Sequence, residues 1–299
     1  MRYLIREHRI PTADARPYII TLGPDGNVWF CESGTGKIGR LSTRDGSFAE
    51  FPLPDRDCMP IGIIAGADGN LWFTESQAHR IGRITPAGVV TEFALPMPNA
   101  GPNGIARGAD GNVWFAEAEA DQVGRITPGG AITEFSAGIT HGNRPLAPTS
   151  AGGFIWISEA EGSAIARVGM DGSIREFPTP TKNSGPRAIT PGVDGHCWFV
   201  QTTANSIGRI APNGEIVEFP FPRAGASLRG IDRTPDGGFL ITENATNFVA
   251  LMDLTGTVLG EYPIPTSQAG ARAILVLRDG RAFFSEHDAG QIGELVPVD

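Results

Sequence analysis

Short apolar runs separated by polar turns follow one another along the chain, and none shows the 3.6-residue period of an amphipathic helix. Residues 60–93 show the pattern best, with apolar runs at 60–65, 71–75, 81–85 and 89–93. The turns between them include Asp68-Gly69-Asn70 and Pro86-Ala87-Gly88. Asp-Gly and Pro-Gly turns between short strands indicate an antiparallel meander of four strands.

This four-strand unit repeats. Trp occurs at 29, 72, 114, 156 and 198, with spacings of 43, 42, 42 and 42 residues. Each Trp opens a phrase such as Trp72-Phe73-Thr74-Glu75, and two weaker copies follow at 240–243 and 283–286, which makes seven units. Seven units of four strands predict an all-β chain folded as a seven-bladed β-propeller, in a single domain over residues 1–299.

The two ends of the chain complement each other. The seventh unit stops at Asp299 without the fourth strand that other units carry, as at Thr91 to Pro96. A matching run, Arg6 to Pro11, lies near the amino terminus. We therefore predict that the N-terminal strand completes the last blade and closes the ring, which leaves no exposed sheet edge.

Composition narrows the class of protein further. The formal charge is −9 and the pI about 5.1, which argues against nucleic acid as a partner. No apolar run approaches the ~20 residues of a membrane span, and the first residues lack the apolar core of a signal peptide. Cys31, Cys58 and Cys197 form neither a metal-spaced pair nor a disulfide framework. We expect a monomeric cytoplasmic protein with reduced thiols and no membrane partner.

Candidate binding residues come from comparing the repeats. In such a blade the first strand lines the central channel and begins with the phrase Pro-x-Gly-Ile. The residues at x are Tyr18, Ile61, Asn103, Leu146, Arg187, Arg229 and Arg272. Arg is suited to bidentate capture of carboxylate or phosphate. We therefore predict a small-molecule or peptide ligand at the channel mouth, bound by Tyr18, Arg187, Arg229 and Arg272.

A second repeated position closes the second strand of each unit, on the same face of the disc. It carries Glu32, Glu75, Glu117, Glu159, Gln201, Glu243 and Glu286. Two interpretations stay open for each set. The glutamates either face a ligand or accept hydrogen bonds from a neighbouring blade's backbone. The three arginines either form a basic patch for a ligand or pair with Glu243 and Glu286. Glu286 and the adjacent His287 are the candidates for catalysis, and Glu286 is the candidate metal ligand.

The phrases at Trp72–Thr85, Gly88–Pro96 and Gly101–Ile105 resemble the virginiamycin B lyase (streptogramin B lyase) family, and the resemblance covers essentially the whole chain. It implies a seven-bladed propeller. It also implies a Mg²⁺-assisted elimination that opens a cyclic depsipeptide antibiotic at its ester linkage, and hence a role in antibiotic resistance.

The chain departs from the family at the catalytic positions. The family has His where this chain has Arg229, and Glu-Pro-His where it has Gly270-Ala271-Arg272. Another family glutamate, after the second strand of blade 7, is matched only approximately by Glu286. Arg stays protonated, so it is no general base, and it offers Mg²⁺ no oxygen. We expect the lyase scaffold without the family's chemistry.

Four functions stay open from the sequence. The first is a lyase with a rearranged site built on Glu286 and His287. The second is a binding propeller for an anionic small molecule or peptide carboxylate. The third is a protein-interaction scaffold. The fourth is a metal-dependent lactonase, with Asn103 and the glutamate series as ligands.

Overall fold

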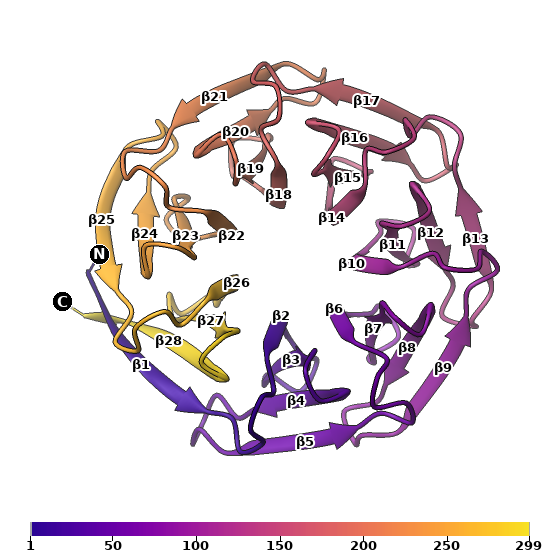
Figure 1. The fold of residues 1–299 in the computed structure, drawn as a ribbon, viewed down its shortest axis with the longest axis horizontal. Coiled ribbons are helices and arrows are strands. Elements are labelled where there is room, and N and C mark those ends of the chain that lie inside the picture. The colour runs from indigo at the N-terminus through magenta and orange to yellow at the C-terminus, as the bar shows by residue number, and fades with distance from the viewer. Residues whose placement is uncertain (1, 299) are drawn as a thin grey trace.

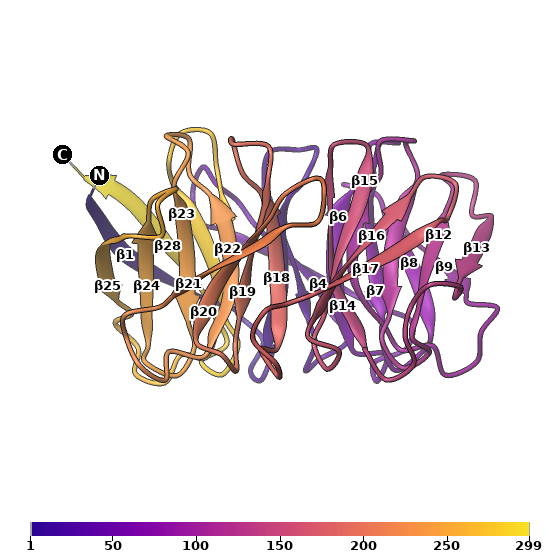
Figure 2. The same ribbon diagram turned by 90° about the horizontal axis from the view of Figure 1, so that it is seen from above.

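Seven antiparallel sheets of four strands form a ring in the computed structural model, which describes residues 2–298. Viewed along its axis the ring surrounds a central opening (Figure 1), and viewed from the side the molecule is a flat disc (Figure 2). Arg2 to Val298 contain no helix, and therefore none long and apolar enough to cross a membrane. The predicted seven-bladed, all-β propeller is confirmed.

The strands of each blade follow the chain from the channel outward, except in blade 7. Blade 1 contains β2 (Pro17–Leu22), β3 (Val28–Glu32), β4 (Lys37–Leu41) and β5 (Phe48–Pro52). Blade 2 contains β6 (Pro60–Ala65), β7 (Leu71–Glu75), β8 (Arg80–Ile84) and β9 (Val90–Ala94). Blade 3 contains β10 (Pro102–Arg107), β11 (Val113–Glu117), β12 (Gln122–Ile126) and β13 (Ile132–Phe135). Blade 4 contains β14 (Pro145–Ala151), β15 (Phe154–Glu159), β16 (Ala164–Gly169) and β17 (Ile174–Pro178).

The remaining blades complete the ring. Blade 5 contains β18 (Pro186–Pro191), β19 (Cys197–Gln201), β20 (Ser206–Ile210) and β21 (Ile216–Pro220). Blade 6 contains β22 (Leu228–Arg233), β23 (Phe239–Glu243), β24 (Phe248–Met252) and β25 (Val258–Pro263). Blade 7 contains β26 (Ala271–Val276), β27 (Ala282–Glu286), β28 (Gln291–Val298) and β1 (Arg2–Arg9).

The two ends of the chain meet in blade 7, as predicted. β1 pairs antiparallel with β28 along its whole length, from Arg2 opposite Val298 to Arg9 opposite Gln291. His8 Nε2 lies 3.0 Å from Glu294 Oε2, and Glu7 accepts hydrogen bonds from the backbone N–H and hydroxyl of Thr266. The N-terminal strand therefore supplies both the outer strand of the last blade and a bond to the segment that precedes that blade.

Apolar side chains packed between the blades form the core. Trp29, Trp72, Trp114 and Trp198 are fully buried, and each indole N–H donates to the aspartate of the preceding turn, as in Trp29 to Asp25 at 2.9 Å. That bond explains why the Asp-Gly turn and the Trp recur together. The Trp series is core, and no Trp lines the channel.

Arginines of the third strands fasten one blade to the next. The Arg40 guanidinium lies 5.3 Å from the centre of the Trp29 ring and donates to the Pro86 carbonyl of blade 2 at 3.1 Å. Arg83, Arg125 and Arg167 make the same pair of contacts around the ring. These arginines therefore have a structural role, since each guanidinium stacks on an aromatic ring of its own blade and donates a hydrogen bond to the next blade.

Closure of the ring generates the first testable prediction. Deleting residues 1–11 leaves the edge of β28 unpaired and removes the Glu7–Thr266 bonds, so we expect a loss of stability in the whole ring. The melting temperature should fall by about 10 °C or more. Differential scanning calorimetry measures it, and adding a synthetic peptide of residues 1–11 should restore part of the loss. An unchanged melting temperature in the truncated protein would contradict the closure.

Candidate functional site

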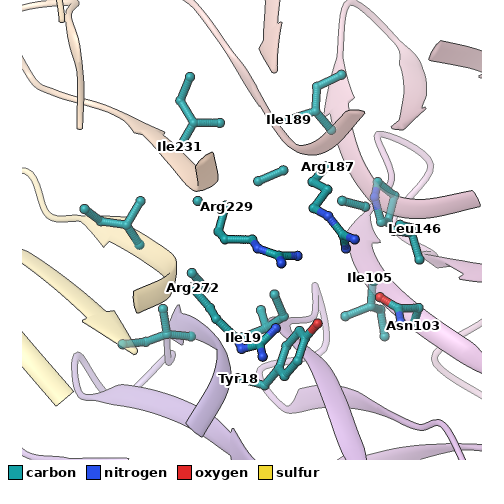
Figure 3. A pocket seen from close by; sticks show the side chains of 18 residues that line it. Tyr18, Ile19, Asn103, Ile105, Leu146, Arg187, Ile189, Arg229, Ile231 and Arg272 are labelled. Carbon is teal, nitrogen blue, oxygen red and sulfur yellow. The ribbon is translucent and has the colours of Figure 1, made fainter. Parts of the chain in front are cut away.

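The channel mouth holds a cavity of about 190 Å³, lined by the first residues of six inner strands (Figure 3). Five blades contribute a polar or charged side chain from the x position, and blade 4 contributes an apolar one. These residues are Tyr18, Asn103, Leu146, Arg187, Arg229 and Arg272. The structure thus brings together all four residues predicted to bind a ligand. The seventh x residue, Ile61, is buried and is not part of the lining.

Close packing of the inner strands brings the x residues together. Each inner strand follows a residue in the left-handed region, such as Ser227 (φ 52°) and Gly270 (φ 70°), which turns the chain into the channel. In blades 2, 3 and 6 the backbone of the next inner strand passes very close to the glycine that follows x. A Cβ at Gly230 would lie 2.3 Å from the carbonyl oxygen of Arg272, so only glycine fits there.

Hydroxyl and amide side chains fix the backbone beside the arginines. Thr242 Oγ1 accepts the N–H of Gly230 at 2.7 Å and donates to the carbonyl of Arg272 at 2.6 Å. Asn244 donates to the Ala271 carbonyl, and Thr202 donates to the carbonyl of Leu228. Sequence reasoning missed these anchors. The signal was the Thr of the phrase Thr-Glu, since Thr74 makes the same two bonds in blade 2.

The arginine trio (Arg187, Arg229 and Arg272) has no charged partner among residues 2–298. None of the three guanidinium groups makes a hydrogen bond or an ion pair, and each Nε is buried without a partner. Burial, together with Arg187 and Arg272, lowers the pKa of Arg229 from 12.5 to about 10. The pKa of Arg187 is lowered as well, again mainly by burial. The mouth therefore concentrates positive charge, which Tyr18 and Glu161 offset only in part at Arg187.

Tyr18 forms the side of the mouth next to Arg272. The Arg272 guanidinium lies over the Tyr18 ring, 4.9 Å from its centre. His287 packs edge-on against the same ring at 5.8 Å, and its Nδ1 lies 2.6 Å from Asp288. Burial, with Arg272 and Arg16 nearby, lowers the pKa of His287 below its ordinary value. His287 is therefore a neutral imidazole near pH 7, behind Tyr18 rather than in the lining of the cavity.

Glu286 lies apart from the trio. Its side chain is fully buried on β27, both carboxylate oxygens lack a hydrogen-bond donor, and the nearest charged group is Glu7 of β1. Glu243, the other proposed partner of the arginines, contacts Arg223 at 3.1 Å. The interpretation in which the trio pairs with Glu243 and Glu286 is therefore wrong.

Buried carboxyl groups occur in nearly every blade in the same arrangement. A second-strand glutamate lies beside a fourth-strand glutamate, as in Glu75 with Glu92 and Glu159 with Glu176. Burial and the neighbouring carboxylate raise the pKa of Glu75, Glu159 and Glu286 to about 8. These three second-strand carboxyl groups are therefore mostly protonated at neutral pH.

The backbone-acceptor role expected for the second-strand glutamates belongs instead to the fourth strand. Glu176 accepts the N–H and hydroxyl of Thr140, Glu218 accepts those of Thr181, and Glu7 those of Thr266. Each of these threonines belongs to the segment that enters the blade. In blade 5, Gln201 replaces the second-strand acid and donates to Glu218 at 2.8 Å. A glutamine side chain at the second-strand glutamate position is thus compatible with the fold.

Comparison with known proteins places the chain. The profile of the Virginiamycin B lyase family matches residues 3–152 and 140–298. The chain belongs to the virginiamycin B lyase family. No curated protein sequence matches it. A streptogramin B lyase structure superposes with a TM-score of 0.93 at 32% identity, over 98% of this chain and 97% of that one.

Two further solved structures are similar over nearly their full lengths. Virginiamycin B lyase from Staphylococcus aureus gives a TM-score of 0.94 at 34% identity, covering 99% of this chain and 100% of that chain. A catalytically inactive variant of the same lyase, solved with quinupristin, gives 0.94 at 33% identity with the same coverage. Kuenenia stuttgartiensis hydrazine synthase shares the fold at 12% identity, with a TM-score of 0.78 and 97% coverage of both chains.

The carboxyl pairs generate a pH prediction. Glu286 keeps its proton to about pH 8 when folded, against an ordinary pKa of 4.5, so the folded state binds more protons between these values. Stability is therefore greatest near pH 5 and declines as the pH rises through 8. The variant Glu286→Gln should mimic Gln201, donate to Glu7, and raise the free energy of unfolding by about 1 kcal/mol at pH 8. Urea unfolding at pH 5 and pH 8 measures both effects.

That experiment has a clear control. The variant Glu215→Gln changes an exposed turn residue and should leave the pH profile unchanged. Loss of stability in Glu286→Gln at pH 8 would contradict a protonated, structural Glu286 and would make it a candidate functional carboxylate again.

The concentrated charge of the trio generates a third prediction. The variant Arg229→Gln removes one of three mutually repelling cations, so we expect the free energy of unfolding to rise by about 1 kcal/mol in the absence of ligand. The control is Arg233→Gln, at the exposed opposite end of the same strand, which should change stability little. Thermal unfolding measures both. Destabilisation by Arg229→Gln alone would mean that its guanidinium has a structural partner.

Proposed function

We propose that this protein binds a small-molecule anion at the channel mouth through Arg187, Arg229 and Arg272. The observation that supports this most is the absence of any acidic side chain from a lining that holds three guanidinium groups. Half-buried cations without partners are costly to the folded protein. A carboxylate or phosphate ligand offsets that cost, because it accepts paired hydrogen bonds from the guanidinium plane.

The metal-assisted elimination implied by the family does not fit these residues. Mg²⁺ requires oxygen ligands, and the lining offers the side-chain oxygens of Tyr18 and Asn103 only. No group of three or more His, Cys, Asp or Glu side chains in residues 2–298 is placed to hold a metal ion. At the position where the family resemblance puts a glutamate, a Cβ on Gly270 would lie 2.3 Å from Asp288. Glu286 faces Glu7 in the core rather than the cavity.

A second candidate is a ring-opening lyase with a rearranged site. Family membership and the similarity to virginiamycin B lyase over 99% of this chain favour it. The residue available for it is His287, whose neutral imidazole accepts a proton near pH 7 and lies against Tyr18 at the mouth.

A ligand screen tests the anion proposal. Thermal-shift measurements with carboxylates, sugar acids and phosphates should identify an anion that raises the melting temperature. The variants Arg229→Gln and Arg272→Gln should each weaken its binding about tenfold or more, since a hydrogen bond to a charged group contributes about 1.5–3 kcal/mol. Arg233→Gln serves as the matched control. A stabilising ligand that binds all three variants equally would contradict the proposal.

A turnover assay separates the two candidates. The protein is incubated with quinupristin or virginiamycin B and Mg²⁺, with and without EDTA, beside the Staphylococcus aureus lyase as control. We expect no linearised product by mass spectrometry while the control turns over. Metal-dependent ring opening by this protein, abolished in His287→Ala, would favour the lyase instead.

A further inference from the structure

The cavity has two chemically different sides. At the x position, blades 5, 6 and 7 supply Arg187, Arg229 and Arg272, whereas blades 3 and 4 supply Asn103 and Leu146. Beyond the x position, all the lining blades add apolar side chains, among them Ile20, Ile105, Ile189, Ile231 and Ile274. Figure 3 shows Leu146, Ile105 and Asn103 across the cavity from Arg272, with the Arg187 guanidinium beside Leu146 and the Arg229 guanidinium near the centre. A site for a simple inorganic anion needs only the first side.

The charges on the basic side exceed what one carboxylate neutralises. Three guanidinium groups face a lining with no carboxylate. Besides burial, the charge of Arg272 lowers the pKa of Arg187, and the charges of Arg187 and Arg272 lower the pKa of Arg229. Their mutual repulsion falls further with a dianion than with a monoanion, because each added negative charge interacts with all three cations. The site is therefore matched to an oxyanion that carries two negative charges.

The other side favours an apolar group. Leu146 and Ile105 line the cavity with apolar side chains that are 7% and 8% exposed, so the ligand atoms that meet them find an apolar wall without hydrogen-bonding groups. Asn103 adds one amide whose side chain has no partner among residues 2–298. Tyr18, fixed between Arg272 and His287, offers an aromatic edge at the boundary between the sides.

We infer that the ligand is a dianionic oxyanion attached to an apolar body, either a dicarboxylate or a phosphate monoester. The trio holds the charged head, and the body lies against Leu146 and Ile105 of blades 4 and 3. This inference rests on the proposed anion-binding function and specifies its ligand class.

A matched series of compounds tests it by isothermal titration calorimetry at pH 7.5 and constant ionic strength. Succinate carries two negative charges and no apolar group. The compound 3-phenylpropionate carries a phenyl group and one negative charge, and 2-phenylsuccinate carries a phenyl group and two negative charges. Phenyl phosphate and inorganic phosphate form the second arm. We expect 2-phenylsuccinate or phenyl phosphate to bind at least about tenfold more tightly than its phenyl-free partner and than 3-phenylpropionate. The tighter of the two identifies the head group.

Variants assign the two parts of the ligand to the two sides. Arg229→Gln should weaken succinate and 2-phenylsuccinate alike, whereas Leu146→Ala should weaken 2-phenylsuccinate severalfold more than it weakens succinate. Thermal unfolding of each variant confirms that it is folded. The comparison of compounds on the unaltered protein tests the inference even if the Leu146→Ala variant is unstable.

The outcomes distinguish an error in the inferred ligand class from an error in the proposed anion-binding function. If small dianions bind through Arg229 but the phenyl group adds nothing, or if 3-phenylpropionate equals 2-phenylsuccinate, the ligand class is wrong and the anion site stands. If no compound binds, or binding ignores Arg229→Gln, the anion site itself is wrong.

Discussion

Pairing of β1 with β28 is the contact on which the rest of the molecule depends. It joins the two ends of the chain over eight residue pairs, from Arg2–Val298 to Arg9–Gln291, and turns seven stacked blades into a closed ring. Closure sets the rotation of each blade relative to the next. It thereby brings the second residue of six inner strands to one end of one channel, where side chains far apart in the sequence line a single cavity.

Arginine has two contrasting roles in this ring. At the third-strand position, Arg40 and its repeats stack on aromatic rings and bond to the next blade's carbonyl groups, so their charge is used within the fold. At the channel mouth, Arg187, Arg229 and Arg272 donate to no carbonyl or carboxylate group, and their Nε atoms are buried without partners, although Arg272 lies over the Tyr18 ring. The acids of the fold are directed away from the mouth, into carboxyl pairs such as Glu286 with Glu7. The positive charge at the mouth is available for a ligand because the fold does not use it.

Much of this was predictable because the repeat compares the chain with itself. The spacing of the Trp residues predicted the blades, and the absence of a fourth strand from the seventh unit predicted closure by the N-terminal strand. Alignment of the repeats at Pro-x-Gly-Ile predicted that Tyr18 and the arginine trio lie together. The direction of Glu286 was not predictable, since alternation along a strand does not say which blade a face meets. The carboxyl pair with Glu7 depends on contact between the two ends of the sequence. The Thr242 anchor likewise depends on how closely β26 approaches β22.

The most direct test of the central claim is a crystal structure of the protein soaked in sodium bromide, with anomalous scattering used to locate the anions. The account predicts a bromide in contact with the guanidinium groups of Arg229 and of at least one other member of the trio. It also predicts no acidic side chain within 4.0 Å of them, the distance that defines an ion pair. Arginines found paired with carboxylates, or a mouth without bromide while other sites are occupied, would contradict it.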